Sequence, residues 1–251
     1  MTLCFQNFTA PSTALKDRVI LVTGASDGIG RAVALSYARH GAQVILLGKT
    51  QVKLEKVYDE ILAMGGATPA LLPFNLENSH AADYQKLADV IDDNCHRLDG
   101  LVHCAGILGD ITLIEHYAPE VWQKVMQVNL HSVFLLTHAL LPLMQQSQQA
   151  SIIFTSSSVG RQGRAHWGAY AVSKFATEGL MQVLGDEVSA IGKIRVNTIN
   201  PGPTRTALRA SAYPAEDPKL LPNPNEITGT YLYLMCDEGK NIQGQALNAQ
   251  T

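Results

Sequence analysis

Short apolar runs of strand length alternate along this chain with longer stretches of helical periodicity. The apolar runs occupy residues 18–23, 43–47, 70–74, 101–104, 151–155, 194–199 and 245–247. They are apolar at successive rather than alternate positions, which is typical of strands buried on both faces. The alternation predicts an α/β fold, a doubly wound parallel sheet of about seven strands with helices on both faces.

Helical stretches fill the intervals between the apolar runs. We expect helices at residues 31–41, 50–64, 80–97, 119–144 and 227–236. The longest has Pro119 in its first turn, where proline is tolerated, and Asn129 in its interior. Because asparagine is a poor helix former, its presence inside this helix requires a specific reason.

Two segments lack this periodicity. Residues 1–17 are expected to form an N-terminal arm across the domain, and a chain of 251 residues suits one domain at 18–251. Residues 204–225 are polar and interrupted by prolines, so this stretch is predicted to be a mobile cover over the site.

A glycine-rich turn, TGASDGIG, joins the first apolar run to the following helix. Small residues let a backbone approach phosphate groups, and a helix N-terminus supplies unpaired N–H groups and partial positive charge. The glycine spacing is GxxxGxG rather than the commoner GxGxxG, and an ordinary loop is the alternative interpretation. As a dinucleotide site, the turn would contribute Gly24, Ser26, Asp27, Gly28, Ile29 and Gly30.

The second apolar run ends in Gly48-Lys49-Thr50, without an acidic residue. A carboxylate there would accept a hydrogen bond from the ribose 2′-hydroxyl of NAD and repel the 2′-phosphate of NADP. Gly48 leaves room for a phosphate and Lys49 offers a cation, so the sequence favours NADP(H) over NAD(H). A solvated lysine in a turn is the alternative.

Tyr170 and Lys174 lie four positions apart, so a helix places them on one face. An ammonium near a phenol favours the phenolate, which would bring the tyrosine pKa toward the range of efficient acid–base catalysis. Tyr170 is therefore a candidate proton donor. An amphipathic surface pair is the alternative, but a serine cluster at residues 156–158 ends the fifth apolar run and favours a site.

Composition narrows the classes of partner. The formal net charge is −3, the pI is about 6.2, and no long run of lysine or arginine occurs, which argues against nucleic acid and anionic membranes. The eight histidines form no recognisable ligand pattern, so no metal is expected. A small-molecule substrate is the remaining class.

Cysteine usage and the chain start indicate the compartment. The four cysteines are scattered without CxxC spacing, as in a reduced cytoplasmic protein. The first 17 residues lack the basic and apolar regions of a signal peptide, and we expect no apolar run that approaches the length of a membrane span. The sequence predicts a soluble, cytoplasmic protein.

Five features in order resemble the short-chain dehydrogenase/reductase superfamily over about residues 18–247. They are TGASDGIG at residues 23–30, Asn129, Ser157, the YxxxK of Tyr170 and Lys174, and the turn at Pro201-Gly202. The resemblance implies a single-domain, Rossmann-type homodimer or homotetramer. Such an enzyme would transfer hydride reversibly between NADP(H) and a carbonyl or alcohol substrate, whose identity is left undefined.

The resemblance also implies roles for individual residues. Ser157, thirteen residues before Tyr170, would orient the substrate carbonyl, and Tyr170 would exchange the proton. Lys174 would hold the nicotinamide ribose and tune Tyr170, while Asn129 would anchor a proton-relay water. The further cofactor contacts expected are Lys49, Asn75, Leu76, Ala105, Gly106, Tyr170, Lys174, Pro201, Gly202, Thr204 and Thr206.

Two positions depart from the family pattern. The family's NNAG after the fourth strand is His103-Cys104-Ala105-Gly106 here, and the acidic residue usual after the third strand is Asn75. The first change leaves the bracing of the strand end undefined, and we expect Cys104 to be a buried thiol rather than an oxidation-sensitive one. The Asn75 oxygen either accepts from the adenine amine or makes a turn.

Several alternatives stay open. Four arginines flank the predicted site: Arg161, Arg164, Arg205 and Arg209. They would suit an anionic substrate, or they are solvated or face the nucleotide. His166 and Trp167 line the substrate space or pack beneath it. A fold alone does not define function, so a catalytically silent NADP(H)-binding sensor or scaffold is the second hypothesis, and an epimerisation or dehydration the third.

Overall fold

The computed structural model describes residues 2–190 and 192–251, and its centre is a parallel β-sheet. The strands are β1 (Val19–Thr23), β2 (Gln43–Gly48), β3 (Ala70–Pro73), β4 (Gly100–His103), β5 (Ala150–Thr155), β6 (Ile194–Asn200) and β7 (Ala246–Asn248). They pair in parallel in the order β3-β2-β1-β4-β5-β6-β7. The order reverses beside β1, and open α/β sheets bind ligands at the carboxyl ends of strands next to such a reversal. The predicted fold is confirmed.

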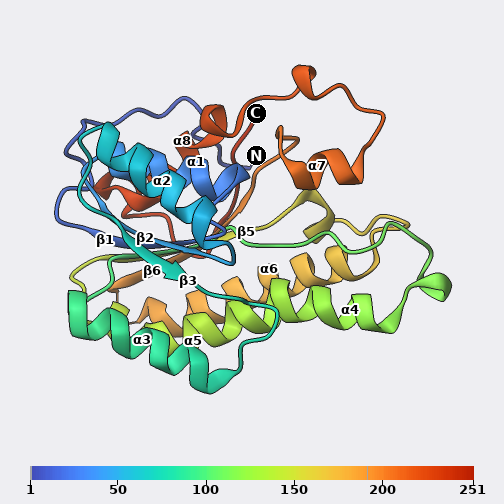
Figure 1. Cartoon of the computed structure of the whole chain (residues 1–251), viewed down its shortest axis with the longest axis horizontal. Coiled ribbons are helices and arrows are strands. Elements are labelled where there is room, and N and C mark those ends of the chain that lie inside the picture. Colours follow the sequence, from blue (N-terminus) through green and yellow to red (C-terminus); the bar gives the residue numbers. More distant parts are fainter. Residues whose placement is uncertain (1, 191) are drawn as a thin grey trace.

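Helices cover both faces of this sheet, as Figure 1 shows. They are α1 (Gly28–Arg39), α2 (Gln51–Ala63), α3 (Ala81–Cys95), α4 (Pro119–Met126), α5 (Ser132–Met144), α6 (Gly168–Ser189), α7 (Ala207–Ala212) and α8 (Gly229–Met235). Helices α1, α2 and α8 pack on one face, and α3, α5 and α6 pack on the other. Short 3₁₀ turns lie at Ile114–His116, Ser158–Gly160, Pro218–Leu220, Pro224–Ile227 and Asp237–Gly239.

Each central strand contributes side chains to two hydrophobic cores. In β1, Ile20 and Val22 join the core under α1, α2 and α8, whereas Val19 and Leu21 join the core under α3, α5 and α6. Because successive side chains of a strand point to opposite faces, both sets must be apolar. This double burial explains the continuous apolar runs in the sequence, and it is why the predicted strand ends agree closely with the observed ones.

The helix predicted at residues 119–144 is continuous but changes its geometry midway. A π-helical turn, Gln127–His131, joins α4 to α5 and contains Asn129. Such turns occur often at functional sites, because they shift the backbone hydrogen-bond register by one residue. The turn gives a reason for an asparagine inside a helix, since its side chain bonds to the loop after β4.

By length and composition this helix is apolar enough to cross a membrane, with a mean hydropathy of 1.2. This reflects a mean over 18 residues and not a continuous apolar run, because polar residues such as Asn129 and His131 interrupt the helix. Half of the apolar window is buried inside the fold, where α5 contributes to the core that α3 and α6 also cover. Burial of this kind is typical of a core helix.

The N-terminal arm packs tightly onto the domain near α8 and β7. Cys4 forms a parallel bridge with Asn248, and the Phe5 ring stacks on Tyr233 with centroids 3.7 Å apart. Leu15 is fully buried. The two chain ends lie on the same side of the molecule (Figure 1), and the arm contributes to the core on that face.

Candidate active site

A cavity of about 670 Å³ opens at the carboxyl ends of the central strands, a size that suits a cofactor or small-molecule site. Every residue predicted to contact the cofactor lines it, from the glycine turn to the segment before α7. Ser157, Tyr170 and Lys174 line it as well, whereas Asn129 does not. Within the described residues, no group of three or more His, Cys, Asp or Glu side chains is placed to hold a metal ion.

Three glycines shape the turn between β1 and α1. Gly24 and Gly28 have φ angles of +65° and +53°, a conformation that residues with a side chain rarely adopt. A Cβ atom at Gly30 would lie 2.4 Å from the Gly24 carbonyl oxygen, so only glycine allows this approach. Asp27 caps α1 by accepting a hydrogen bond from the Gly28 N–H at 2.7 Å. The start of α1 thus brings N–H groups and partial positive charge to the cavity, which fits the phosphates of a dinucleotide.

Two lysines and one carboxylate lie at the end of the cavity beside β2. Lys49 Nζ is 3.4 Å from one Glu77 oxygen, and Lys124 Nζ is 2.9 Å from the other. Hydrogen bonds and charge from Lys124, and then from Lys49, lower the pKa of Glu77. One carboxylate between two ammonium groups leaves a net positive charge at this end. The sequence motifs did not point to Glu77 or Lys124, because neither belongs to a local pattern.

Asn75 makes the turn that places Glu77 beside Lys49. Its side-chain oxygen accepts a hydrogen bond from the Glu77 N–H at 3.1 Å. Of the two alternatives left open for Asn75, this contact is the turn. Because a carboxamide oxygen has a second lone pair and Asn75 lines the cavity, acceptance of a hydrogen bond from an adenine amine stays a prediction.

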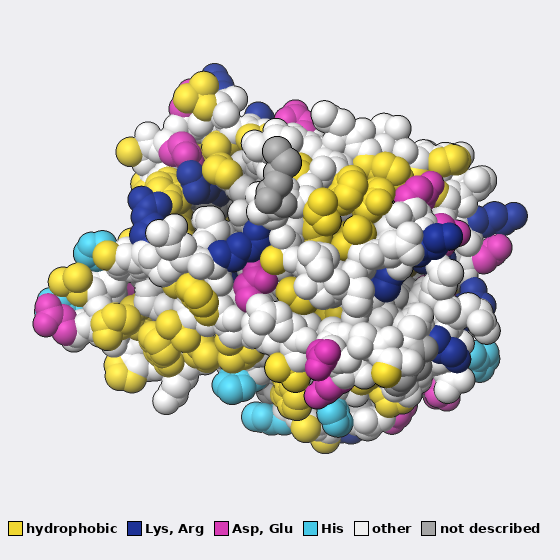
Figure 2. All heavy atoms as spheres, turned by 180° about the vertical axis from the view of Figure 1, so that it is seen from behind, with side chains coloured by type: hydrophobic (Ala, Val, Ile, Leu, Met, Phe, Trp, Pro, Cys, Tyr) yellow, Lys and Arg dark blue, Asp and Glu magenta, His cyan; other side chains and the backbone are white. Residues whose placement is uncertain are grey.

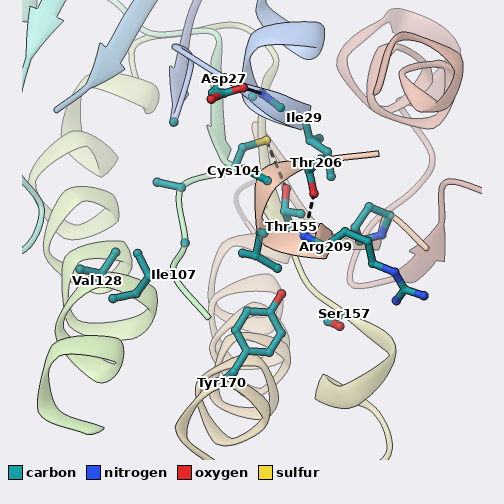
Figure 3. Close-up of a pocket in the computed structure, with 18 of the residues that line it drawn as sticks. Asp27, Ile29, Cys104, Ile107, Val128, Thr155, Ser157, Tyr170, Thr206 and Arg209 are labelled. Carbon is teal, nitrogen blue, oxygen red and sulfur yellow. Dashed lines mark hydrogen bonds between the residues drawn. The ribbon is translucent and has the colours of Figure 1, made fainter. Parts of the chain in front are cut away.

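Three of the four predicted catalytic side chains come from the C-terminal end of β5 and from α6. Ser157 follows β5, and Tyr170 and Lys174 lie one turn apart near the start of α6. Figure 3 shows the Tyr170 hydroxyl directed into the space between Ile107 and Ser157. A carbonyl group in that space would lie between two hydroxyl donors.

Burial sets the protonation of both α6 residues. Desolvation raises the pKa of Tyr170 to about 12, and the Ser157 side chain opposes this rise by hydrogen bonding. Desolvation lowers the pKa of Lys174 to about 8, and the nearby Cys104 and Glu178 oppose that shift. Both shifts share one cause, because burial disfavours the charged form of each group.

The expectation that Lys174 lowers the pKa of Tyr170 was wrong for this structure. Lys174 Nζ donates a hydrogen bond to the Thr155 carbonyl at 2.7 Å and lies 5.7 Å from the centroid of the Tyr170 ring. The ammonium is thus held against the end of β5 rather than against the phenol. Desolvation therefore dominates the pKa of Tyr170.

Asn129 lies behind the cavity and braces the loop after β4. Its carboxamide accepts a hydrogen bond from the Ile107 N–H and donates one to the Ile107 carbonyl, both at 2.9 Å. It also donates to Ser173 Oγ at 3.1 Å. These contacts occupy the carboxamide of Asn129, and its predicted role in anchoring a proton-relay water stays a prediction.

Two hydroxyl groups brace the end of β4, where the family pattern is not kept. His103 Nε2 lies 3.0 Å from Thr137 Oγ1, and burial lowers the His103 pKa to about 3. Thr23 Oγ1 accepts hydrogen bonds from the N–H groups of Cys104 and Ala105 at 3.1 and 3.0 Å. Burial raises the pKa of the Cys104 thiol to about 11, so the thiol is protonated at neutral pH and weakly reactive.

The segment at residues 204–225 folds over the cavity as α7 and the turn Pro218–Leu220. Leu208, Arg209 and Tyr213 line the cavity from this segment, and Trp167 lines it from the residue before α6. Leu208 and Tyr213 lie in no motif, so the sequence offered no signal for them. The mobility of this cover stays a prediction.

Residues 18–217 match the family model of the short chain dehydrogenases. The uncharacterised oxidoreductase YciK of Escherichia coli strain K12 is 54% identical over 236 residues, which cover 94% of this chain and 93% of YciK.

Two solved structures have a similar fold and a bound cofactor. A short chain dehydrogenase from E. coli CFT073, complexed with NADPH, gives a TM-score of 0.94 at 53% identity, covering 96% of this chain and 100% of the other. One from Shigella flexneri 2a, complexed with NADP, gives a TM-score of 0.93 at 52% identity, with the same two coverages. Because the family model and these relatives span most of the sequence, this chain belongs to the short-chain dehydrogenase/reductase family of oxidoreductases.

Proposed function

We propose that this enzyme transfers hydride reversibly between NADP(H) and a carbonyl or alcohol compound. The observation that carries the proposal is the convergence of Ser157, Tyr170 and Lys174 on one cavity with the glycine turn of α1. The same cavity offers N–H groups for the phosphates and hydroxyl groups for a carbonyl. When bound, NADP(H) supplies or accepts the hydride.

Ser157, Tyr170 and Lys174 each have a task that their surroundings suit. In the reducing direction, the Tyr170 hydroxyl donates its proton to the substrate oxygen, and a pKa of about 12 keeps that proton in place until then. Ser157 donates a hydrogen bond to the same oxygen and orients it. Lys174 would contact the nicotinamide ribose from its place beside Thr155.

NADP(H) is the proposed cofactor in preference to NAD(H). Support comes from Lys49 and Lys124, which outnumber the one carboxylate between them, and from the lack of an acidic residue directly after β2. The two relatives with bound NADP or NADPH agree with it.

The test of the function is a screen of carbonyl compounds for NADPH oxidation, with the Tyr170→Phe variant beside the wild type. We expect turnover to fall by about 10²–10⁴-fold in Tyr170→Phe, because the general acid is lost, while NADPH binding is nearly unchanged. Wild-type turnover in the variant would refute the role of Tyr170. Tight NADPH binding without turnover across the panel would favour a sensor or scaffold. Conversion without net cofactor use would indicate epimerisation or dehydration.

We also propose a homodimer or homotetramer and a cytoplasmic location. Apolar side chains stand half-exposed along α5 and α6, namely Phe134, Val172, Phe175 and Val183. An apolar row of this kind is typical of a surface that a partner copy covers.

Acidic and basic groups are interspersed on the face in Figure 2, which fits a small-molecule enzyme better than a nucleic-acid binder. The four free cysteines suit a reducing compartment.

A further inference from the structure

The part of the cavity in front of Tyr170 has an apolar wall. Trp167 and Tyr170 are nearly fully buried, with ring centroids 5.8 Å apart, and Tyr213 lies 5.8 Å from Trp167 on the other side. Leu208 and Ala212 of α7 pack against this aromatic group and also line the cavity. An apolar group placed on the wall would leave water without losing any hydrogen bond.

The arginines around this wall offer no free charge to a ligand inside the cavity. Arg209 alone of the four lines the cavity, and both its Nε and Nη2 donate to the Glu216 carboxylate, at 2.6 and 2.7 Å. Its guanidinium also lies 3.7 Å from the centroid of the Tyr213 ring. A bidentate pair of this kind neutralises the cation and fixes its orientation.

The other three arginines do not line the cavity. Arg161 is paired with Glu178 at 3.0 Å, and Arg205 donates to the Leu221 carbonyl. Arg164 is exposed and donates to the Tyr213 hydroxyl at 2.7 Å on the outer side of the wall.

The lysines that line the cavity have other tasks: Lys49 and Lys124 share Glu77, and Lys174 bonds to Thr155. None of these lysines belongs to the cluster that forms the wall, so a carboxylate brought to the wall would lose its hydration without meeting a free cation among the wall's own residues. Burial of an unpaired carboxylate is strongly unfavourable.

We propose that the substrate is uncharged and apolar beyond its reacting carbonyl or alcohol group, and that the wall of Trp167, Leu208 and Tyr213 selects it. The Arg209–Glu216 pair contributes to this selection because Glu216 neutralises Arg209, which leaves no free positive charge at the wall for an anionic compound. The proposal rests on the proposed function, because it concerns the substrate of the same site. It decides against the anionic substrate that the four arginines had left open.

The experiment compares acetophenone with 4-acetylbenzoate, which share a carbonyl and differ in one carboxylate. Binding of each to the NADP-loaded protein is measured by calorimetry, and turnover with NADPH is measured in parallel. We expect acetophenone to be preferred by at least about tenfold in both measurements, as follows from a carboxylate left unpaired on desolvation. Equal or tighter binding of 4-acetylbenzoate, or binding of neither compound, overturns the proposal.

A variant of Glu216 tests directly whether its ion pair with Arg209 excludes anionic compounds. Glu216→Gln frees Arg209, so 4-acetylbenzoate should bind about tenfold better while acetophenone is unaffected. Glu187→Gln makes the same charge change on an exposed position of α6 and should alter neither compound. An unchanged preference in Glu216→Gln contradicts the role of the pair. Because binding is measured separately, a protein that binds acetophenone selectively but turns over no carbonyl compound counts against the proposed function and not against this inference.

Discussion

At the scale of single residues, the site is governed by burial more than by the charges that its motif brings together. Tyr170 and Lys174 are one helical turn apart, yet desolvation moves the pKa of the phenol up to about 12 and that of the amine down to about 8. The site therefore holds a neutral phenol beside an amine that loses its proton readily.

The depressed pKa of Lys174 predicts a specific dependence of stability on pH. The unfolded lysine keeps its proton up to a pKa near 10.4, whereas the native one releases it near 8. Between these two pKa values the unfolded state binds more protons than the native state, so the free energy of unfolding rises with pH. Below pH 8 the buried amine is charged, and the native state carries the full destabilisation. Lys174→Met removes this rise.

Thermal unfolding of the cofactor-free protein between pH 7 and 9.5 checks this prediction. The wild type should gain stability relative to Lys174→Met as the pH rises above about 8. Lys86→Met, at an exposed position of α3, is the control and should follow the wild type. Parallel curves for wild type and Lys174→Met would contradict the shift.

A second residue-scale prediction concerns Lys49 and the cofactor. Lys49→Asp places a carboxylate at the end of β2, where it repels a 2′-phosphate and accepts from a 2′-hydroxyl. We expect the Kd for NADP to rise by about tenfold or more, the size of a lost charge-assisted contact, and the Kd for NAD to fall. Fluorescence titration with both cofactors measures the change, with Lys86→Asp as the control. Unaltered NADP binding would contradict the proposed contact between Lys49 and the 2′-phosphate.

At the scale of elements, the position of Ser157, the proposed hydrogen-bond donor to the substrate, depends on the contact between the 3₁₀ turn Ser158–Gly160 and α6. A Cβ atom at Gly160 would lie 2.7 Å from Lys174 Cβ, so glycine permits the turn to touch the helix. Arg161, directly after the turn, pairs with the buried Glu178 of α6 at 3.0 Å and bonds to Asn248 at 2.9 Å. These contacts tie the turn after Ser157 to the helix that carries the other two groups.

We therefore predict that Arg161 positions the active site. Arg161→Gln leaves Glu178 buried with Thr198 as its remaining partner, and the free energy of unfolding should fall by about 1–3 kcal/mol. The turnover number should fall while the KM for NADPH stays nearly constant, because the glycine turn is untouched. Adding Glu178→Gln should restore part of the stability, since the unpaired charge is gone. Calorimetry and steady-state kinetics measure both effects, and a rise in the KM for NADPH alone would argue against positioning.

At the scale of the whole molecule, the sheet brings distant segments to one place. The strand order reverses beside β1, so the loops after β1, β4, β5 and β6 all meet at the cavity. The N-terminal arm covers the edge of the sheet at β7, where Cys4 forms a bridge with Asn248. The outer face of α5 and α6 is left with exposed apolar groups.

The proposed assembly leads to a prediction for that outer face. Phe175→Asp puts a charge in the apolar row of α6, and burying an unpaired carboxylate at a subunit contact is unfavourable. We expect the variant to be monomeric where the wild type is dimeric or tetrameric, as measured by light scattering after size-exclusion chromatography. Val90→Asp, at a similarly exposed position of α3, should keep the wild-type mass. A variant of unchanged mass would place the interface elsewhere.

Sequence patterns over short stretches were sufficient to predict the helices and strands and much of the site. The strands were predictable because double burial demands continuous apolar runs, and the glycine turn because its backbone excludes side chains at Gly24, Gly28 and Gly30. Ser157, Tyr170 and Lys174 stand at short spacings on adjacent elements, so a motif captures them. Each of these features depends on residues close together in the sequence.

Only the tertiary structure decided how these groups are charged and what surrounds them. The pKa of Tyr170 depends on its burial, and the pairing of Arg209 with Glu216 and of Lys49 with Glu77 depends on where loops from different strands come to rest. Tyr213 reaches the cavity only because α7 folds back over it. Desolvation and ion pairing act through space, so a pattern along the chain could predict which groups line the cavity but not the environment that sets their charge.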